Sequence, residues 1–392
     1  MKVLEIISLG YVAGGAENAI VKISPHLLNK GYSIKVLASD LGINKKHFNE
    51  YVFKNVSFAG PLKIFLFLFN PSSFFALRKI LKEYKPDIVH MHVMHEITPS
   101  VLFLLAKYPT VMTLHGPEAF LHELLIWFLQ PSDFKNKAYD KKDLKVGGKL
   151  RYLYFNYIQK FFYKLGFRNV DVFIAPSKYM QNAARTDVSP IVCLPNFIEL
   201  GKFHEVKNKY NILFVGRLEK IKGAEFLIKA IPSIIEACPQ ARLTLVGDGR
   251  EKASLLDLGK KLRIENYIQF VGWVESKDLD AYYEKASIVV VPSICPENFP
   301  TVCSEAMSAG RPVIGTVVGG IPEIIDDGVN GYLVEPKNSV QIAEKIVKVF
   351  LEGNLEEFGR EARKKAERFN IEKHIYELEK IYKEVISKYK QI

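Results

Sequence analysis

Short apolar runs rich in β-branched residues alternate along this chain with longer stretches of helical period. Such alternation is typical of βαβ units, which build a parallel sheet with helices on both faces. The series starts again after Asn196, so we predict two doubly wound α/β domains joined near Pro195 and Asn196. The predicted strands cover 3–9, 34–39, 87–91, 110–114 and 172–175 in the first half, and 211–215, 242–246, 268–271, 288–291 and 312–315 in the second.

The cysteines and the apolar runs exclude several classes of protein. Four scattered cysteines form neither a disulfide framework nor a CxxC metal motif, so we expect a reduced, cytoplasmic protein. The apolar start of the chain is broken by Glu5 and runs into a glycine loop, and we interpret it as a first strand rather than a signal peptide. The runs at 64–69 and 121–129 fall short of the roughly 18–20 apolar residues that a membrane span needs.

The net charge of +11 is unevenly placed along the chain. Residues 1–195 hold 25 Lys and Arg against 14 Asp and Glu, whereas the remaining residues hold 29 of each. Residues 131–168 combine ten Lys or Arg with ten aromatic residues. This segment fits two interpretations: an amphipathic helix whose aromatic side enters the core, or a surface for anionic headgroups that 64–69 would join. A nucleic-acid groove would use the same residue types but has no support elsewhere, so we expect no nucleic-acid partner.

Two glutamates eight residues apart follow the predicted strand 288–291. Glu297 falls in a proline-rich loop, whereas Glu305 falls about one turn into a predicted helix over 301–309. The free N–H groups at the start of that helix suit an anionic ligand. The structural alternative is a surface glutamate followed by an unrelated helical one.

Other candidate residues also fall at the ends of predicted strands. Arg217 and Lys222 could fix a diphosphate without a metal ion, because a guanidinium and an ammonium supply the positive charge. Gly14 and Gly15 would let the backbone approach a phosphate or a sugar where a helix begins. His115 closes a strand. The structural alternatives are solvated cations, a tight loop and a strand-end histidine.

Together these segments resemble the retaining glycosyltransferases of family 4, which have the GT-B fold. Glu297 to Glu305 resembles the family's E-x7-E motif, including its E-x-F-P-x-V-x-x-E pattern. The family's G-R-L-x-x-x-K-G, its first-loop G-G-A-E and the strand ends of its N-terminal domain are matched in order by 216–223, 14–17, 86–92 and 113–116.

The resemblance implies a GT-B architecture of two Rossmann-like doubly wound parallel-sheet domains that face each other across a cleft. Residues 196–374 would bind the donor and residues 1–195 would form the acceptor side. The last helix, about 375–392, would pack back on the first domain.

The resemblance also implies roles for individual residues. His115, Glu297, Arg217 and Lys222 would act in catalysis, with Arg217 and Lys222 on the donor diphosphate. Glu305 would accept hydrogen bonds from the ribose hydroxyls. Further donor contacts are expected from Gly14, Gly15, Gly272, Val274, Phe299, Thr301 and Val302, and acceptor contacts from Glu17, His92 and Glu118.

His90 and His92 share one strand end. Because successive residues of a strand point to opposite faces, we expect at most one of the two to face the cleft.

The implied reaction transfers a sugar from a nucleoside-diphosphate sugar to a hydroxyl with retention of configuration. It would follow a front-face mechanism that needs no metal and no cofactor. The basic first half favours a lipid-linked acceptor and peripheral contact with an anionic membrane at its inner face, while soluble saccharide acceptors stay open. The alternatives are a GT-B nucleotide-sugar epimerase and a non-catalytic sugar-nucleotide-binding protein. The sequence leaves the base, the sugar, the linkage and the oligomeric state undetermined.

Overall fold

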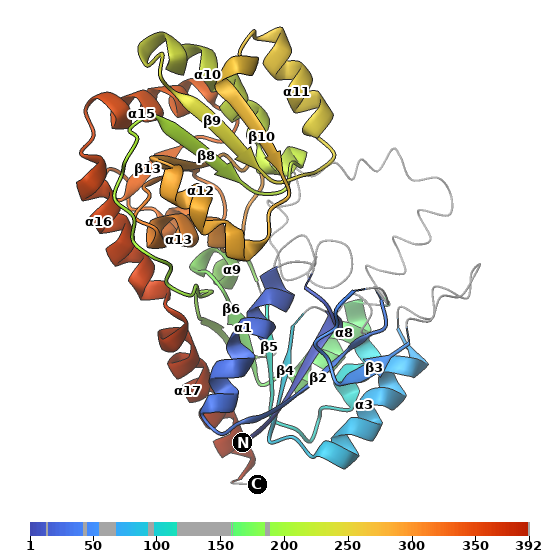
Figure 1. Ribbon diagram of the computed structural model, residues 1–392. Helices are drawn as coiled ribbons and strands as arrows, with labels where there is room; N and C mark the ends of the chain where they lie inside the picture. The colour runs from blue at the N-terminus through green and yellow to red at the C-terminus, as the bar shows by residue number, and fades with distance from the viewer. Residues whose placement is uncertain are drawn as a thin grey trace, which may run out of the picture. The chain divides into compact units, whose positions relative to one another are not determined.

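The computed structural model describes residues 1–12, 15–41, 45–54, 68–92, 98–115, 158, 160–184 and 189–390. The chain divides into two compact units, which are Met1–Pro195 together with His374–Ile392, and Asn196–Lys373. Each unit has its own parallel sheet covered by helices (Figure 1). The predicted fold class of two doubly wound parallel-sheet domains is confirmed.

The first unit contains a seven-stranded sheet of order β3-β2-β1-β4-β5-β6-β7, in which all pairs are parallel. Its strands are β1 (Lys2–Leu9), β2 (Ser33–Ser39), β3 (Tyr51–Phe53), β4 (Ile88–Met91), β5 (Thr110–Thr113), β6 (Val172–Ala175) and β7 (Ile191–Cys193). Its helices are α1 (Gly15–Asn29), α3 (Pro71–Tyr84), α4 (Pro99–Phe103), α8 (Lys160–Gly166), α9 (Lys178–Ala183) and most of α17 (Ile371–Tyr389).

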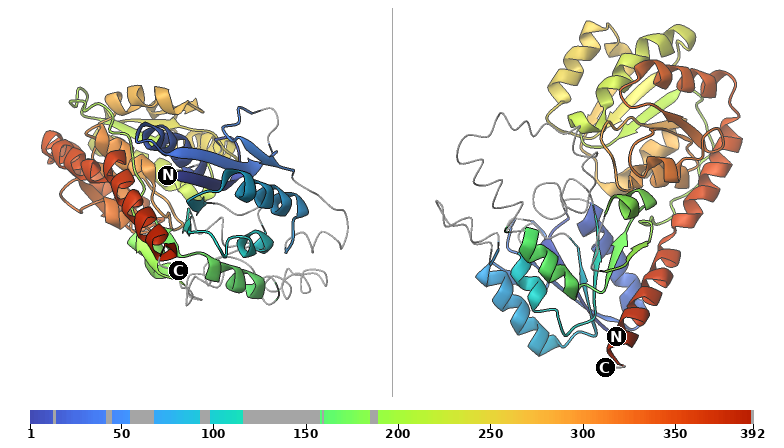
Figure 2. Two further views of the ribbon diagram at one scale, coloured as in Figure 1. Left: turned by 90° about the horizontal axis from the view of Figure 1, so that it is seen from below. Right: turned by 180° about the vertical axis from the view of Figure 1, so that it is seen from behind.

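The two faces of this first sheet have different neighbours. Leu4 and Ile6 of β1 belong to an apolar core with side chains of α3 and α4. The residue between them, Glu5, points the other way because side chains alternate along a strand. On that other face lies α17, whose Tyr382 reaches His90 of β4. Figure 2 shows α17 beside the first unit, with both chain ends near the same end of it.

The second unit contains a six-stranded parallel sheet of order β10-β9-β8-β11-β12-β13. Its strands are β8 (Asn211–Val215), β9 (Arg242–Val246), β10 (Ile268–Gly272), β11 (Ile288–Val291), β12 (Val313–Thr316) and β13 (Gly331–Val334). Its helices are α10 (Ala224–Ala237), α11 (Lys252–Lys261), α12 (Asp280–Lys285), α13 (Thr301–Ser308), α14 (Ile321–Ile324), α15 (Ser339–Leu351) and α16 (Leu355–Ala366). Separate apolar cores lie on its two faces, one formed with α10 and α15 and the other with α13 and α16.

Within the described part of the chain, no helix is both long enough and apolar enough to cross a bilayer. Residues 64–67 of the apolar run at 64–69 lie outside the described residues, as do 121–129 and 131–157. Of the basic aromatic segment, the structure describes residue 158 and the end from 160 to 168. There Tyr163 and Phe167 are buried in the core, whereas Phe161 and Phe162 are exposed.

Candidate functional site

The carboxyl ends of the central strands β8 and β11 gather the charged residues of the second unit. These two strands are neighbours, and the order of the sheet reverses here, since β9 and β10 lie beyond β8 while β12 and β13 lie beyond β11. In open parallel sheets this reversal is where ligands bind, because the loops on its two sides diverge and leave a crevice. Lys222 follows β8 and Glu297 follows β11, so both lie at the reversal.

Glu297 and Lys222 form an ion pair at this point. The Nζ atom of Lys222 lies 2.7 Å from Oε2 of Glu297, and the hydroxyl of Ser293 donates to Oε1. The side chains remain 25% and 16% exposed, so a ligand can reach both. The backbone holds the pair as well: the N–H of Gly320 donates to the carbonyl of Glu297 over 2.6 Å.

Lys222 is held by the loop that carries it. It ends a single turn of 3-10 helix, Lys220–Lys222, and Gly223 follows in the left-handed region at φ 69°. A Cβ atom on Gly223 would lie 1.9 Å from the carbonyl oxygen of Pro292, so only glycine lets the two loops meet so closely. The N–H of Ile294 donates to the carbonyl of Ile221 over 2.9 Å and ties the loops further. Lys222 is therefore placed relative to Glu297 by backbone contacts.

Arg217 lies earlier in the same loop and is exposed. Among the residues that the structure describes, it forms no ion pair, unlike Lys222. The two residues predicted to bind a diphosphate therefore lie in one loop, but Lys222 is paired with Glu297 whereas Arg217 is exposed.

The helix α13 begins three residues after Asn298, and Glu305 lies on its second turn. The hydroxyl of Tyr283 donates to Oε2 of Glu305 over 3.1 Å. Pro300 precedes the helix and no side chain caps it, so the first-turn N–H groups, including those of Thr301 and Val302, have no partner within the helix. Such N–H groups, together with the helix dipole, favour a negatively charged ligand.

The remaining donor candidates of this unit lie nearby along the sheet edge. Gly272 ends β10 at φ 90°, and its carbonyl accepts from the N–H of Gly247 over 2.7 Å. Val274 is half-buried and Phe299 is buried, while Trp273 between the β10 end and Val274 is 72% exposed.

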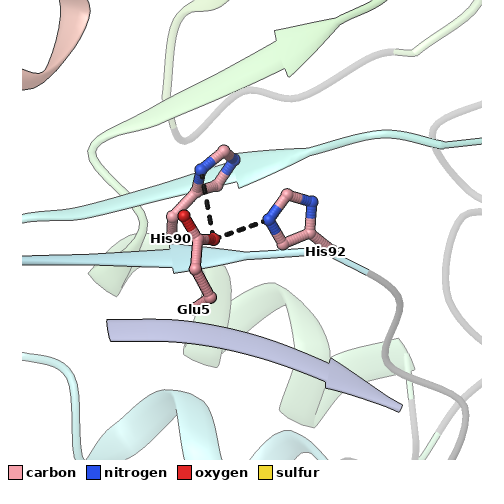
Figure 3. Close-up of side chains that lie close together, drawn as sticks. All are labelled: Glu5, His90 and His92. Atoms are coloured by element: carbon pink, nitrogen blue, oxygen red, sulfur yellow. Dashed lines mark hydrogen bonds and ion pairs between the residues drawn. The ribbon is translucent and has the colours of Figure 1, made fainter. Parts of the chain in front are cut away.

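In the first unit, the buried side chains of Glu5, His90 and His92 lie close together (Figure 3), and His92 is hydrogen-bonded to both Glu5 and His115. Oε2 of Glu5 lies 2.7 Å from Nε2 of His92 and 3.5 Å from Nδ1 of His90. Nδ1 of His92 lies 2.7 Å from Nε2 of His115. The two ring nitrogens of His90 have other hydrogen-bond partners. Nδ1 lies 2.6 Å from the hydroxyl oxygen of Tyr382, and Nε2 lies 2.7 Å from Oγ1 of Thr113.

The expectation that His90 and His92 point to opposite faces, so that at most one of them faces the site, is wrong. The two residues are two positions apart on a strand, so their side chains lie on the same face. Both rings contact the same oxygen of Glu5 (Figure 3).

Burial keeps this histidine group uncharged. It raises the pKa of Glu5 to about 8 and lowers the pKa of His92 to about 3. The pKa values of His90 and His115 are lowered well below the usual range, first by burial and then by the neighbouring histidines. At neutral pH the carboxyl group therefore keeps its proton and the imidazoles stay neutral.

Glu5, His90 and His92 are also a group whose ligand atoms lie within 4.8 Å of one another, as a metal site requires. Every ring nitrogen of the two histidines already has a hydrogen-bond partner. We therefore interpret the group as a hydrogen-bond network.

The other candidates of the first unit are only partly described. Gly15 is exposed at the start of α1, and Glu17 is buried on the same helix. Gly14 and Glu118 lie outside the described residues.

Four residues around the two sites were not predicted from the sequence: Glu5, Ser293, Tyr283 and Tyr382. Glu5 left a signal, because a single acid inside the apolar strand KVLEIISL needs a buried partner. Tyr283 and Tyr382 left none, because they come from other segments of the chain than their partners Glu305 and His90. Ser293 lies only four residues before Glu297, but a single serine in a loop carries no pattern that marks it.

Two family models match the chain, and together they cover residues 13–368. The model described as "Glycosyltransferase Family 4" matches residues 13–202, and the one described as "Glycosyl transferases group 1" matches residues 198–368. The chain belongs to the family 4 glycosyltransferases.

The relatives of this glycosyltransferase agree with that placement. It is 42% identical over 147 residues to the uncharacterized glycosyltransferase MJ1607 of Methanocaldococcus jannaschii, a match that spans 38% of this chain and 37% of that relative. The sucrose-phosphate synthase of Thermosynechococcus elongatus has a TM-score of 0.74 at 21% identity, over 98% of this chain and 99% of that one. Anabaena HepE in complex with UDP has a TM-score of 0.68 at 20% identity, over 97% and 99%. These likenesses confirm the GT-B class of the fold.

Proposed function

We propose that this glycosyltransferase moves a sugar from a nucleoside-diphosphate sugar to a hydroxyl acceptor with retention of configuration. The observation that carries the proposal is the Lys222–Glu297 pair at the reversal of the second sheet, directly before the N-terminus of α13. A cation and a row of N–H groups suit a diphosphate, and a carboxylate suits sugar hydroxyls. The family placement supports the same chemistry, and the UDP complex of HepE supports a nucleoside diphosphate as the ligand.

In this proposal Arg217 and Lys222 hold the donor diphosphate, and Glu305 accepts hydrogen bonds from the ribose. Two fixed cations stabilise the charge that develops on the leaving nucleotide, which is the work that a metal ion does in other transferases. We therefore propose a reaction that requires neither a metal nor a cofactor. Gly272, Val274, Phe299, Thr301 and Val302 complete the donor contacts.

The proposed mechanism is a front-face displacement. Glu297 is occupied by Lys222 and Ser293, so it is better suited to holding a sugar hydroxyl than to forming a covalent bond at the anomeric carbon. The nucleotide then leaves from the face on which the acceptor hydroxyl attacks. His115, Gly14 and Gly15 are assigned to the transferred sugar.

For the acceptor, we propose a lipid-linked or membrane-surface glycan that binds to the first domain. The support is the excess of 25 basic over 14 acidic residues in 1–195, because anionic lipids attract such a surface. Glu17, His92 and Glu118 are the proposed acceptor residues, although the structure shows His92 fully engaged with Glu5 and His115.

Nucleotide binding tests this proposal most directly. Thermal unfolding of the full chain would be followed with UDP, GDP and ADP, each with and without magnesium. A ligand at 100 times its dissociation constant adds about 2.7 kcal/mol to the free energy of unfolding. We expect one nucleotide to stabilise without magnesium, and the effect to be lost in Lys222→Ala. Stabilisation only with magnesium would contradict the metal-independent mechanism, and stabilisation by none would contradict the donor site.

Turnover separates a transferase from the other activities of such a site. With the nucleotide identified, its sugar conjugate would be incubated with lipid-linked and soluble acceptors, and the anomeric configuration of the product read by NMR. Release of nucleotide that depends on an acceptor, with retention, is expected. Conversion of the sugar without an acceptor would point to an epimerase instead.

A further inference from the structure

The hydrogen bonds between Glu5, His92 and His115 form one unbranched path. Glu5 meets Nε2 of His92, and the opposite nitrogen of the same ring meets Nε2 of His115, each over 2.7 Å. Glu5 and His92 are almost fully buried, with side chains 5% and 4% exposed, so water does not compete for these bonds. His115 ends the path and is partly exposed. Within the described part of the chain, its Nδ1 atom has no hydrogen-bond partner.

Each bond along this path holds one hydrogen, so the positions of the hydrogens are linked. A neutral imidazole carries its proton on one nitrogen and a lone pair on the other. When Glu5 is protonated it donates to Nε2 of His92, the proton of His92 then lies on Nδ1 and is donated to His115, and His115 carries its own proton on Nδ1. When Glu5 is ionised it accepts from Nε2 of His92, Nδ1 of His92 accepts from His115, and Nδ1 of His115 is left with a lone pair. The two states differ by one proton, which is lost to solvent.

We propose that Glu5 and His92 are positioning residues that set the tautomer of His115 and so decide whether its Nδ1 atom offers a hydrogen or a lone pair. The role of His115 beside the transferred sugar rests on the proposed function, but the linkage of the protons rests only on the geometry of the first unit. A donor at Nδ1 would hold a sugar hydroxyl by its oxygen, whereas an acceptor would hold it by its hydrogen. The network thus determines how the sugar is oriented.

The surroundings of Glu5 favour the state with a donor at neutral pH. Burial raises the pKa of Glu5 to about 8, so the carboxyl group is mostly protonated below that value. The titratable groups around it are His90 of β4, the residues His92 and His115 that follow β4 and β5, and Tyr382 and His374 from α17. His374 is bonded to the carbonyl of Pro195, and Tyr382 to His90, so neither lies on the path. The facing strand β2 places Val36 beside Glu5, which brings no charge.

The tautomer can be measured directly on the full wild-type chain. Protein labelled with ¹⁵N-histidine would be titrated by NMR from pH 6 to 9, with the His115 signals assigned by their loss in His115→Asn. We expect the proton of His115 on Nδ1 at low pH, and its transfer to Nε2 as the pH passes the pKa of Glu5. A tautomer that stays the same over this range would overturn the proposal, and this experiment needs no variant of Glu5.

Three variants then test the path. Glu5→Gln and His92→Phe should abolish the pH-dependent change, because one removes the titrating group and the other the connection. His90→Gln is the matched control, since His90 also contacts Glu5 but lies off the path to His115, and it should keep the change. A change that survives in Glu5→Gln would overturn the proposal. Stoichiometric bound zinc in the purified protein would overturn it as well, because the metal would take the nitrogen lone pairs.

Kinetics with the identified donor extend the test to the reaction. His92→Phe should lower kcat roughly tenfold or more, because the tautomer of His115 is then no longer set by Glu5, while KM for the donor stays the same. The wild-type kcat should change with pH through the pKa of Glu5, and the variant should lack that dependence. If no donor turns over, the proposed function fails, yet the NMR titration still decides the linkage of the protons.

Discussion

Glu5 lies on a central strand of the first sheet, and Glu297 follows a central strand of the second sheet. The environments of the two carboxyl groups are opposite. Glu297 is partly exposed and is balanced by Lys222. Glu5 is almost fully buried among histidines and keeps its proton. An exposed ion pair exchanges partners readily and suits a charged ligand, whereas a buried neutral network is rigid and suits uncharged hydroxyls. The ion pair of the second unit therefore suits a charged group such as a diphosphate, and the network of the first unit suits uncharged hydroxyl groups.

The largest expected effect is on catalysis through the ion pair of the second unit. Lys222→Ala should cost about 2–4 kcal/mol of transition-state stabilisation, which is a loss of roughly 30- to 1000-fold in kcat/KM. The matched control is Lys229→Ala, which removes an exposed lysine paired with Glu225 on α10. Steady-state kinetics on both variants would check this, and equal activity of the two would show that Lys222 does not contact the diphosphate.

The second prediction concerns acid, to which the first unit should be the more sensitive. The pKa of His92 falls from 6.5 in the unfolded chain to about 3 when folded, so between these values the unfolded chain binds more protons and stability falls as the pH falls. From pH 6.5 to pH 5 this histidine alone should cost about 2 kcal/mol. His374, whose pKa falls to about 4, acts in the same direction. Glu5 acts in the opposite direction, because its raised pKa lowers stability as the pH rises from 4.5 to 8.

Hydrogen exchange at pH 7 and pH 5 would compare the two units within one sample. We expect β4 and β5 to lose protection at pH 5 before β8 and β11 do. The second unit has a single histidine, His204, so it provides the internal reference. Equal loss in both units would show that the buried histidines do not determine acid sensitivity.

A smaller effect is expected from the loop that holds Glu297. Gly319 has φ 59°, and a Cβ atom there would lie 2.1 Å from the carbonyl oxygen of Glu297. Gly319→Ala should cost about 1–3 kcal/mol of stability and displace Glu297, lowering activity too. Gly328→Ala is the control, because its φ of 76° is similar but a Cβ there meets nothing within 4 Å. Chemical denaturation would compare the stability of the two variants, and kinetics would compare their activity. Equal stability and equal activity would contradict the close approach at Gly319.

The smallest effects are expected at helix N-caps, where the two units should behave alike. Asn70 accepts from the N–H groups of Ser72 and Ser73 at α3, and Asn338 accepts from that of Gln341 at α15. Replacing either by alanine should cost about 1 kcal/mol. Denaturation midpoints would check this, and a much larger loss for one variant would reveal a role for that asparagine beyond its helix.

The sequence predicted the central strands of both sheets better than it predicted the outermost strands. The buried central strands are short apolar runs rich in β-branched residues, which is the pattern of a strand covered on both faces. The missed strands β3, β7 and β13 each lie at an edge of a sheet and have three or four residues, so they leave only a short apolar run. The strand-end motifs located Lys222, Glu297 and Glu305, because a family pattern is continuous along the chain. The network around Glu5 is not continuous, since its members come from β1, β4, β5 and α17.

The return of residues 374–392 to the first unit also has a consequence for biosynthesis. The ribosome completes all of Asn196–Lys373 before it makes Tyr382, so the middle of the chain has its full sequence while the first sheet still lacks the helix that covers His90. Domains fold as units during synthesis. We therefore expect the second unit to complete its fold before the first, although its residues are synthesised later than most of the first unit. In a nascent chain stalled just after residue 373 has left the ribosome, the second unit should resist protease and the first should not.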